Sequence, residues 1–189
     1  MDTPVFPAGP LTEGWFIVRW NNDNTGYNTS QSIVVLQNGA TAVVRLFGTA
    51  ATVTSTLSLH VNGTLVGTTA GFYGDAVEVI AIDFDLSTTP PKAGLVISGI
   101  REINLTAGSG VPTTINRVKF SSGHGGGAAY FGDFALFDDL NDFTDDAVTQ
   151  DLWVTYLDAN VVTDGDNSWT PSSGTDLTAT DFPFATAKP

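Results

Sequence analysis

Short runs rich in Val, Ile, Thr, Phe and Tyr recur along the chain, separated by clusters of Gly, Pro, Asn and Asp. No long segment repeats apolar residues at helical spacing, whereas several runs alternate apolar and polar residues as β-strands do. Many short strands joined by turns are typical of an all-β, antiparallel β-sandwich. The pattern predicts strands at 15–20, 31–37, 40–47, 52–61, 64–69, 75–86, 93–98, 100–106, 113–120, 129–137 and 147–157.

The clearest predicted hairpin joins residues 57–61 to residues 64–66 through Asn62 and Gly63. An Asn-Gly pair supplies the two positive-φ positions that a type I′ turn requires. Side chains alternate between the two faces of a strand. The Leu and Val residues of the first strand therefore face a core, and His60 faces solvent.

The run from Val77 to Asp85 is hydrophobic at successive positions rather than alternate ones. A strand of this kind has both of its faces buried. The pattern predicts a central strand that is covered on both sides.

The length of 189 residues allows one full domain and hardly two. We predict a sandwich domain over 15–158, an N-terminal arm over 1–14 and an extended C-terminal arm over 159–189. The C-terminal arm carries Trp169, Phe182 and Phe184, and full exposure of such side chains costs about 1.5–3 kcal/mol each. These three residues are therefore the predicted assembly anchors, which would dock on this subunit or on a neighbouring one.

The net charge of −13 is concentrated at one end of the chain, since residues 133–189 contain twelve Asp residues and one cation, Lys188. Such a surface repels phosphate backbones and anionic lipids. We expect no nucleic-acid binding and no membrane insertion. The N-terminus lacks the basic and apolar regions of a secretory signal, so we expect synthesis in the cytoplasm without export.

Candidate catalytic chemistry is sparse, because the chain has no Cys and its two His residues are His60 and His124. The nearest approach to a glycosidase motif is Glu78 with Asp83 and Asp85. Glu78 and Asp83 are separated by an odd number of positions and so point to opposite faces of an unbroken strand. We predict hydrogen-bonded or solvated strand carboxylates and no enzyme; glycoside hydrolysis remains an alternative.

An acidic turn after residue 137 is the candidate metal site. Ca²⁺ takes six to eight oxygen ligands, and a bound cation would offset the repulsion among neighbouring carboxylates. The spacing is not specific, so a solvated acidic turn without a cofactor is the other interpretation. The candidate Ca²⁺ ligands are Asp138, Asp139, Asp142, Asp145 and Asp146.

The glycine-rich segment 123–127 precedes a predicted strand rather than a helix, which argues against a phosphate-binding loop. A flexible inter-strand loop is one interpretation, and a carbohydrate-contacting loop is the other. In the second case the candidate contacts are His124, Gly125, Gly126 and the aromatic Trp153.

Four segments occur in an order that resembles a known family: 61–63 (Val-Asn-Gly), 130–139 (Tyr-Phe-Gly-Asp-Phe-Ala-Leu-Phe-Asp-Asp), 151–157 (Asp-Leu-Trp-Val-Thr-Tyr-Leu) and 167–174 (Asn-Ser-Trp-Thr-Pro-Ser-Ser-Gly). Together they resemble the concanavalin A-like (lectin/glucanase) jelly-roll domain of tailed-bacteriophage virion proteins. The resemblance covers about 15–175 and is strongest over 130–174. The family's opening acidic and aromatic strand region is short or missing here.

This resemblance implies a non-enzymatic virion structural protein exposed on the particle, such as a head decoration protein or a head- or tail-fibre subunit. The implied partners are copies of the chain itself, with a trimer as the guess, and capsid or tail proteins. A dedicated receptor-recognition protein that binds host-surface polysaccharide is the alternative.

Overall fold

The computed structural model describes residues 9–23, 32–48, 56–71, 73, 76–121 and 128–142. The chain divides into two compact units, residues 1–148 and 149–189, and every described residue belongs to the first. The predicted C-terminal arm and the predicted strand 147–157 lie outside the described residues.

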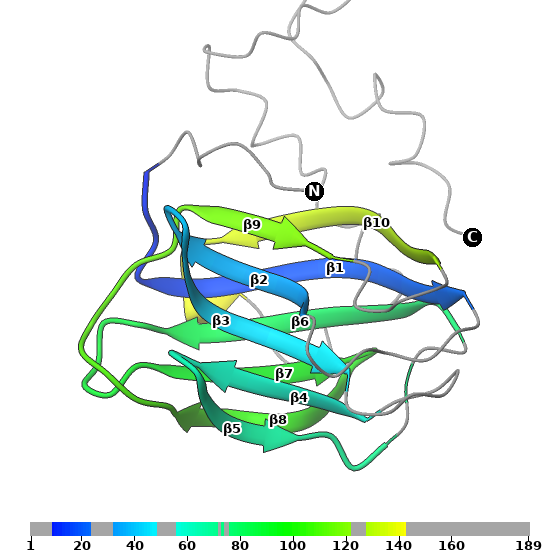
Figure 1. Ribbon diagram of the computed structural model, residues 1–189, viewed down its shortest axis with the longest axis horizontal. Helices are drawn as coiled ribbons and strands as arrows, with labels where there is room; N and C mark the ends of the chain where they lie inside the picture. The colour runs from blue at the N-terminus through cyan, green and yellow to red at the C-terminus, as the bar shows by residue number, and fades with distance from the viewer. Residues whose placement is uncertain are drawn as a thin grey trace, which may run out of the picture. The chain divides into compact units, whose positions relative to one another are not determined.

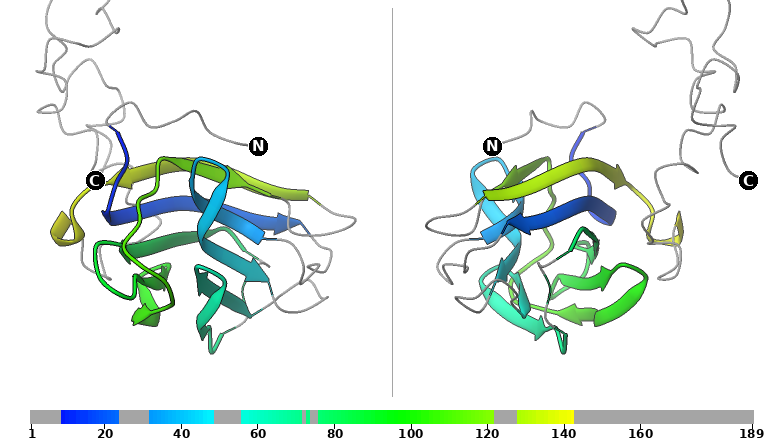
Figure 2. Two further views of the ribbon diagram at one scale, coloured as in Figure 1. Left: turned by 60° about the vertical axis from the view of Figure 1, so that its left-hand side comes forward. Right: turned by 90° about the vertical axis from the view of Figure 1, so that its right-hand side faces the viewer.

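Two five-stranded sheets face one another in the described part of the chain (Figures 1 and 2). The first sheet has the order β10-β1-β6-β7-β8. Its strands are β1 (Glu13–Asp23), β6 (Glu78–Asp85), β7 (Lys92–Ile97), β8 (Ile100–Ala107) and β10 (Ala128–Phe137). The second sheet has the order β5-β4-β3-β2-β9. Its strands are β2 (Ser32–Asn38), β3 (Thr41–Gly48), β4 (Leu57–Val61), β5 (Thr64–Thr68) and β9 (Arg117–Phe120).

All neighbouring strands in both sheets pair antiparallel. A short 3-10 turn, η1 (Leu140–Asp142), follows β10. The predicted antiparallel β-sandwich is therefore confirmed. No helix among the described residues is long and apolar enough to cross a membrane.

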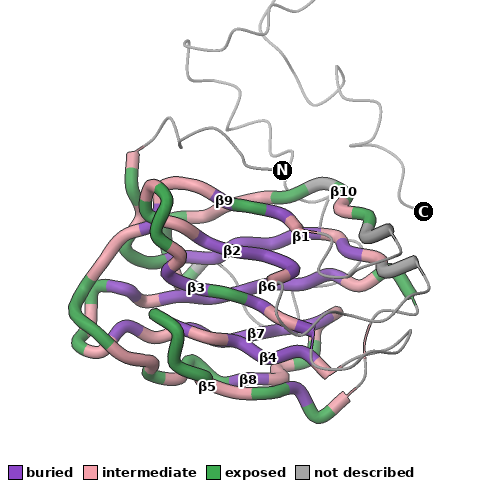
Figure 3. Tube along the Cα trace, viewed as in Figure 1, coloured by how far each residue is buried: buried purple, intermediate pink, exposed green. Residues whose placement is uncertain are grey.

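The core lies between the two sheets and consists of their inward-facing aliphatic and aromatic side chains. Figure 3 marks the buried positions along the strands of both sheets. Strand alternation places Val34, Leu46 and Leu59 in one row on the inner side of the second sheet. Phe16 of β1 and Phe120 of β9 meet across the core, with ring centroids 6.0 Å apart. At roughly 1.5–3 kcal/mol for each large buried side chain, this interior is the main source of stability.

The central strand of the first sheet, β6, is buried on both faces, as its continuous hydrophobic run predicts. Ile80 and Ile82 point into the core, and the intervening Ala81 is equally inaccessible on the outer side. The prediction of a strand covered on both sides is confirmed.

The predicted strand 113–120 is shorter in the structure, because its first residues cross from one sheet to the other. The N–H of Thr113 donates to the carbonyl of Leu86, and Ile115 bridges to Leu11. The N–H of Asn116 then donates to Gln37, and β9 begins only at the next residue. The backbone bonds of this crossover are thus divided among three partners and form no continuous ladder.

Candidate functional site

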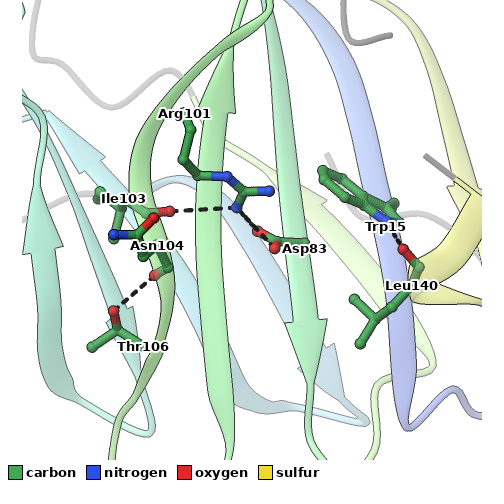
Figure 4. Close-up of polar contacts among 7 residues, drawn as sticks. All are labelled: Trp15, Asp83, Arg101, Ile103, Asn104, Thr106 and Leu140. Carbon is green, nitrogen blue, oxygen red and sulfur yellow. Dashed lines mark hydrogen bonds and ion pairs between the residues drawn. The ribbon is translucent and has the colours of Figure 1, made fainter. Parts of the chain in front are cut away.

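The outer face of the first sheet is covered at its centre. Ile17, Val79 and Val96 all point away from the sandwich core and are nevertheless fully buried. Trp15 beside them is 2% exposed and donates its indole N–H to the carbonyl of Leu140 in η1, at 3.0 Å (Figure 4). This apolar surface is packed and is not available to a ligand.

The three carboxylates that formed the glycosidase candidate are each held by a neighbour. Asp83 is buried and paired with Arg101 on the outer face. Glu78 accepts a 2.7 Å hydrogen bond from the Ser98 hydroxyl, and Asp85 accepts one of the same length from Ser87. The registers of β6 place Glu78 in line with the inward positions and Asp83 with the outward ones, as predicted.

The outer face of the second sheet has a different character, because Arg45 at its centre and Lys119 at its edge are cationic and exposed to solvent. A row of directly paired residues runs across it from β9 to β5. Phe47 lies on the same face, two positions after the central residue of the row. We call this surface the open face; it comprises Val35, Arg45, Phe47, His60, Leu65 and Lys119.

Arg45 and Lys119 are exposed, Phe47 and His60 are half-buried, and Leu65 is 54% exposed. Val35 forms a buried apolar floor between the two cations. The open face therefore combines exposed hydrogen-bond donors with a buried apolar base. Small-molecule sites in proteins likewise combine apolar and aromatic side chains with a few polar groups.

The side chains of Phe47 and His60 form an aromatic pair at the centre of the open face. The rings of Phe47 and His60 are 4.9 Å apart at an interplanar angle of 70°, an edge-to-face arrangement. Arg45 is the direct cross-strand neighbour of His60, so this residue lies next to the pair on the same face. Opposed residues in antiparallel strands have Cβ atoms about 4.5–5.5 Å apart, which is close enough for one ligand to contact both.

The strands of the second sheet contain no Asp or Glu. No carboxylate of the described residues pairs with Arg45 or Lys119. These cations can therefore bind an external acceptor without first breaking an ion pair in the described part of the chain.

The other predicted site residues are outside what the structure describes. This group includes the predicted carbohydrate contacts, which are His124, Gly125, Gly126 and Trp153. It also includes the predicted assembly anchors. The anchors concerned are Trp169, Phe182 and Phe184.

The predicted Ca²⁺ loop is described only in part. Asp138 and Asp139 are exposed, and one oxygen of Asp139 accepts hydrogen bonds from the backbone and the side chain of Asn141, both at 2.8 Å. The side chains of Asp142, Asp145 and Asp146 lie outside the described residues. Within the described ranges, no three potential metal ligands come together.

Sequence reasoning did not single out Arg45, Phe47 or Lys119. The available signal was alternation: Arg45 and Phe47 flank the core residue Leu46 and so had to point outward. Their position beside His60 depends on cross-strand register, which one strand's pattern does not contain.

No protein-family model matches the chain, and no curated protein matches its sequence. Among solved structures, the chain is similar to a tetrameric galectin from the ball sponge Cinachyrella sp., with a TM-score of 0.49 and 15% identity over 72% of this chain and 98% of that one. It is also similar to the native heptameric SAP-like pentraxin from Limulus polyphemus, with a TM-score of 0.48 and 12% identity over 81% and 78% of the two chains. Likenesses at this level carry no functional assignment to this chain.

Proposed function

We propose that the protein is a non-enzymatic carbohydrate-binding module whose ligand lies on the open face. The observation that carries this proposal is the contrast between the two outer sheet faces. The side chains around Trp15 are buried, whereas the open face presents Phe47, His60 and Arg45 together at the surface.

These three side chains suit the two kinds of surface that a sugar offers. The ring carbons of a pyranose form an apolar face that packs against an aromatic side chain such as Phe47. The hydroxyl groups accept hydrogen bonds from the five N–H donors of Arg45, and the imidazole of His60 both donates and accepts when neutral.

The five strands of this face lack the carboxyl groups that glycoside hydrolysis requires. Most glycosidases use two carboxyl groups on either side of the scissile bond, about 5–9.5 Å apart. The strands that form the open face carry no carboxylate. This absence on those strands supports binding without turnover.

The test is binding of the full-length protein to an array of glycans, compared with Arg45→Gln and Phe47→Ala variants. A Lys92→Gln variant is the matched control, because Lys92 begins β7 in the other sheet. We expect binding by the wild type and the control, and loss in the two open-face variants with an unchanged far-UV circular dichroism spectrum. A folded wild-type protein that binds nothing, or that releases reducing ends, would overturn the proposal.

We further propose a place for this module on the surface of a tailed-phage particle, as a head-decoration or fibre subunit. The support is the family resemblance of residues 130–174 together with the anchors Trp169, Phe182 and Phe184. Antibody labelling of purified particles tests the location. Removal of residues 159–189 tests assembly: we expect a folded sandwich that no longer forms oligomers, and unchanged oligomers would contradict the proposed role of the anchors.

A further inference from the structure

Acidic residues are absent from two long stretches of a chain that is otherwise strongly acidic. Residues 24–74 and 103–132 contain none of the 20 Asp and Glu residues. The same stretches contain three of the seven Lys and Arg residues, namely Arg45, Arg117 and Lys119.

The fold brings these two stretches together in one sheet. The first supplies β2, β3, β4 and β5, and the second supplies β9, which pairs with β2. All five strands of the second sheet are therefore free of acid, whereas the first sheet carries Glu78, Asp83, Asp85 and Glu102 on β6 and β8. The charge of the molecule is separated by sheet as well as by sequence.

The cations of the second sheet share its outer side. Lys119 is paired with Val35, and Val35 is paired with Arg45, so the two charges lie two strands apart, about 10 Å across the sheet. Arg117 precedes Lys119 by two positions and so points to the same side. Arg45 lies next to the aromatic pair of the open face, and Lys119 and Arg117 lie two strands further, on the edge strand β9.

We infer that the ligand of the open face is an acidic polysaccharide, one whose sugar rings carry carboxylate, sulfate or phosphate groups. This inference rests on the proposed carbohydrate-binding function and names its ligand class. The guanidinium of Arg45 binds such an anion in a bidentate geometry, and the ammonium of Lys119 attracts a second anionic group further along the polymer.

Two features of the open face favour an acidic polysaccharide over the alternatives. A neutral glycan makes no use of the charges of Lys119 and Arg117. An Asp-rich peptide, including the acidic residues 133–189 of a second copy, supplies the charge but has no sugar ring to pack on Phe47. A polymer of charged sugar rings offers anionic groups to the cations and a ring face to Phe47.

The acidic residues in the rest of the chain repel a polyanion and so favour its approach to the acid-free sheet. Repulsion between a polyanion and the acidic regions is screened beyond about 8 Å at physiological ionic strength. The acid-free sheet is thus the surface on which close approach is favourable, and binding there is sensitive to salt.

The experiment measures binding of the full-length protein by isothermal titration calorimetry to polygalacturonate, to neutral dextran and to a poly-aspartate peptide. We expect polygalacturonate to bind most tightly and to weaken as sodium chloride is raised. Arg45→Gln should reduce its affinity about tenfold or more, as expected for loss of charge-assisted hydrogen bonds. Lys119→Gln should reduce it about two- to fivefold, as for an exposed ion pair.

Lys92→Gln is the matched control, since it removes one cation from the other sheet, and we expect wild-type affinity. Equal, salt-independent binding of dextran and polygalacturonate would overturn the acidic ligand while leaving carbohydrate binding in place. Poly-aspartate binding as tightly as polygalacturonate would also overturn it, in favour of an acidic peptide. Failure of the folded protein to bind polygalacturonate would overturn the acidic ligand, and failure to bind any glycan of the array would overturn the proposed function itself.

Discussion

Asp83 and Arg101 form an ion pair on the outer side of the first sheet, where Nη1 of Arg101 lies 2.7 and 2.8 Å from the two carboxylate oxygens (Figure 4). The Asp83 side chain is 6% exposed and that of Arg101 is 21% exposed. The guanidinium carbon also lies 5.5 Å from the centre of the Trp15 ring. The pair therefore links β6 and β8 across β7 in a largely dehydrated position.

Replacement of Arg101 by Met should lower the free energy of unfolding by about 3–5 kcal/mol, because it leaves the buried carboxylate of Asp83 without its cation. Urea denaturation at neutral pH measures the change. The double variant Asp83→Asn with Arg101→Met removes both charges and should be more stable than the single Arg101 variant. A single variant as stable as the wild type would show that the carboxylate is not dehydrated.

The two sheets approach closely at the β5 and β8 edges, where Gly67 faces Ile103. A Cβ atom on Gly67 would lie 2.6 Å from Cγ2 of Ile103, well inside van der Waals contact. Gly67→Ala should therefore destabilise the protein by about 1–3 kcal/mol through overpacking.

Ile103→Ala provides the test of this contact. On its own it should cost about 2–5 kcal/mol through loss of buried side-chain volume. Combined with Gly67→Ala, the added methyl group fills part of the vacated space, so the double variant should lose less stability than the sum of the single variants. Strictly additive losses in guanidinium denaturation would contradict the predicted contact.

Local pattern sufficed to predict most of the described strands. Asn62 and Gly63 occupy the positive-φ turn that the dipeptide required, with φ of 48° and 82°. The continuous apolar run of β6 likewise predicted its central place in the first sheet. These features depend on neighbouring residues in the sequence, and their physical causes act over a few residues.

The features that local pattern missed depend on contacts between distant residues. Ser58 lies on the outer side of β4, as His60 does, but it is only 6% exposed, which the alternation of the strand does not predict. The open face combines residues from five strands. Four of these strands come from one acid-free stretch of the sequence, and β9 comes from a second, distant one. Register and strand order, rather than composition, bring these residues together.

Tyr73 is tied to β8 through Glu102, since its hydroxyl donates a 2.6 Å hydrogen bond to one carboxylate oxygen. The other oxygen accepts from the backbone N–H of Ala70, at 3.0 Å. Burial raises the pKa of Tyr73 above its usual range, and the hydrogen bond and charge of Glu102 and the charge of Glu78 raise it further. The folded protein therefore holds this proton more firmly than the unfolded chain does.

The linkage between protonation and folding gives this contact a pH signature. An unfolded tyrosine loses its proton near pH 10, so the contribution of Tyr73 is fully present below that pH and is lost as the pH rises toward the folded-state pKa. Tyr73→Phe should be less stable than the wild type at pH 8, because Glu102 loses a donor. Its stability should then decline less steeply between pH 10 and 11.

Guanidinium denaturation at pH 8, 9, 10 and 11 measures both effects. Tyr130→Phe is the matched control, because Tyr130 is 56% exposed on β10, and its stability should follow the wild-type slope. Parallel curves for the wild type and Tyr73→Phe would mean that Glu102 does not hold the phenolic proton.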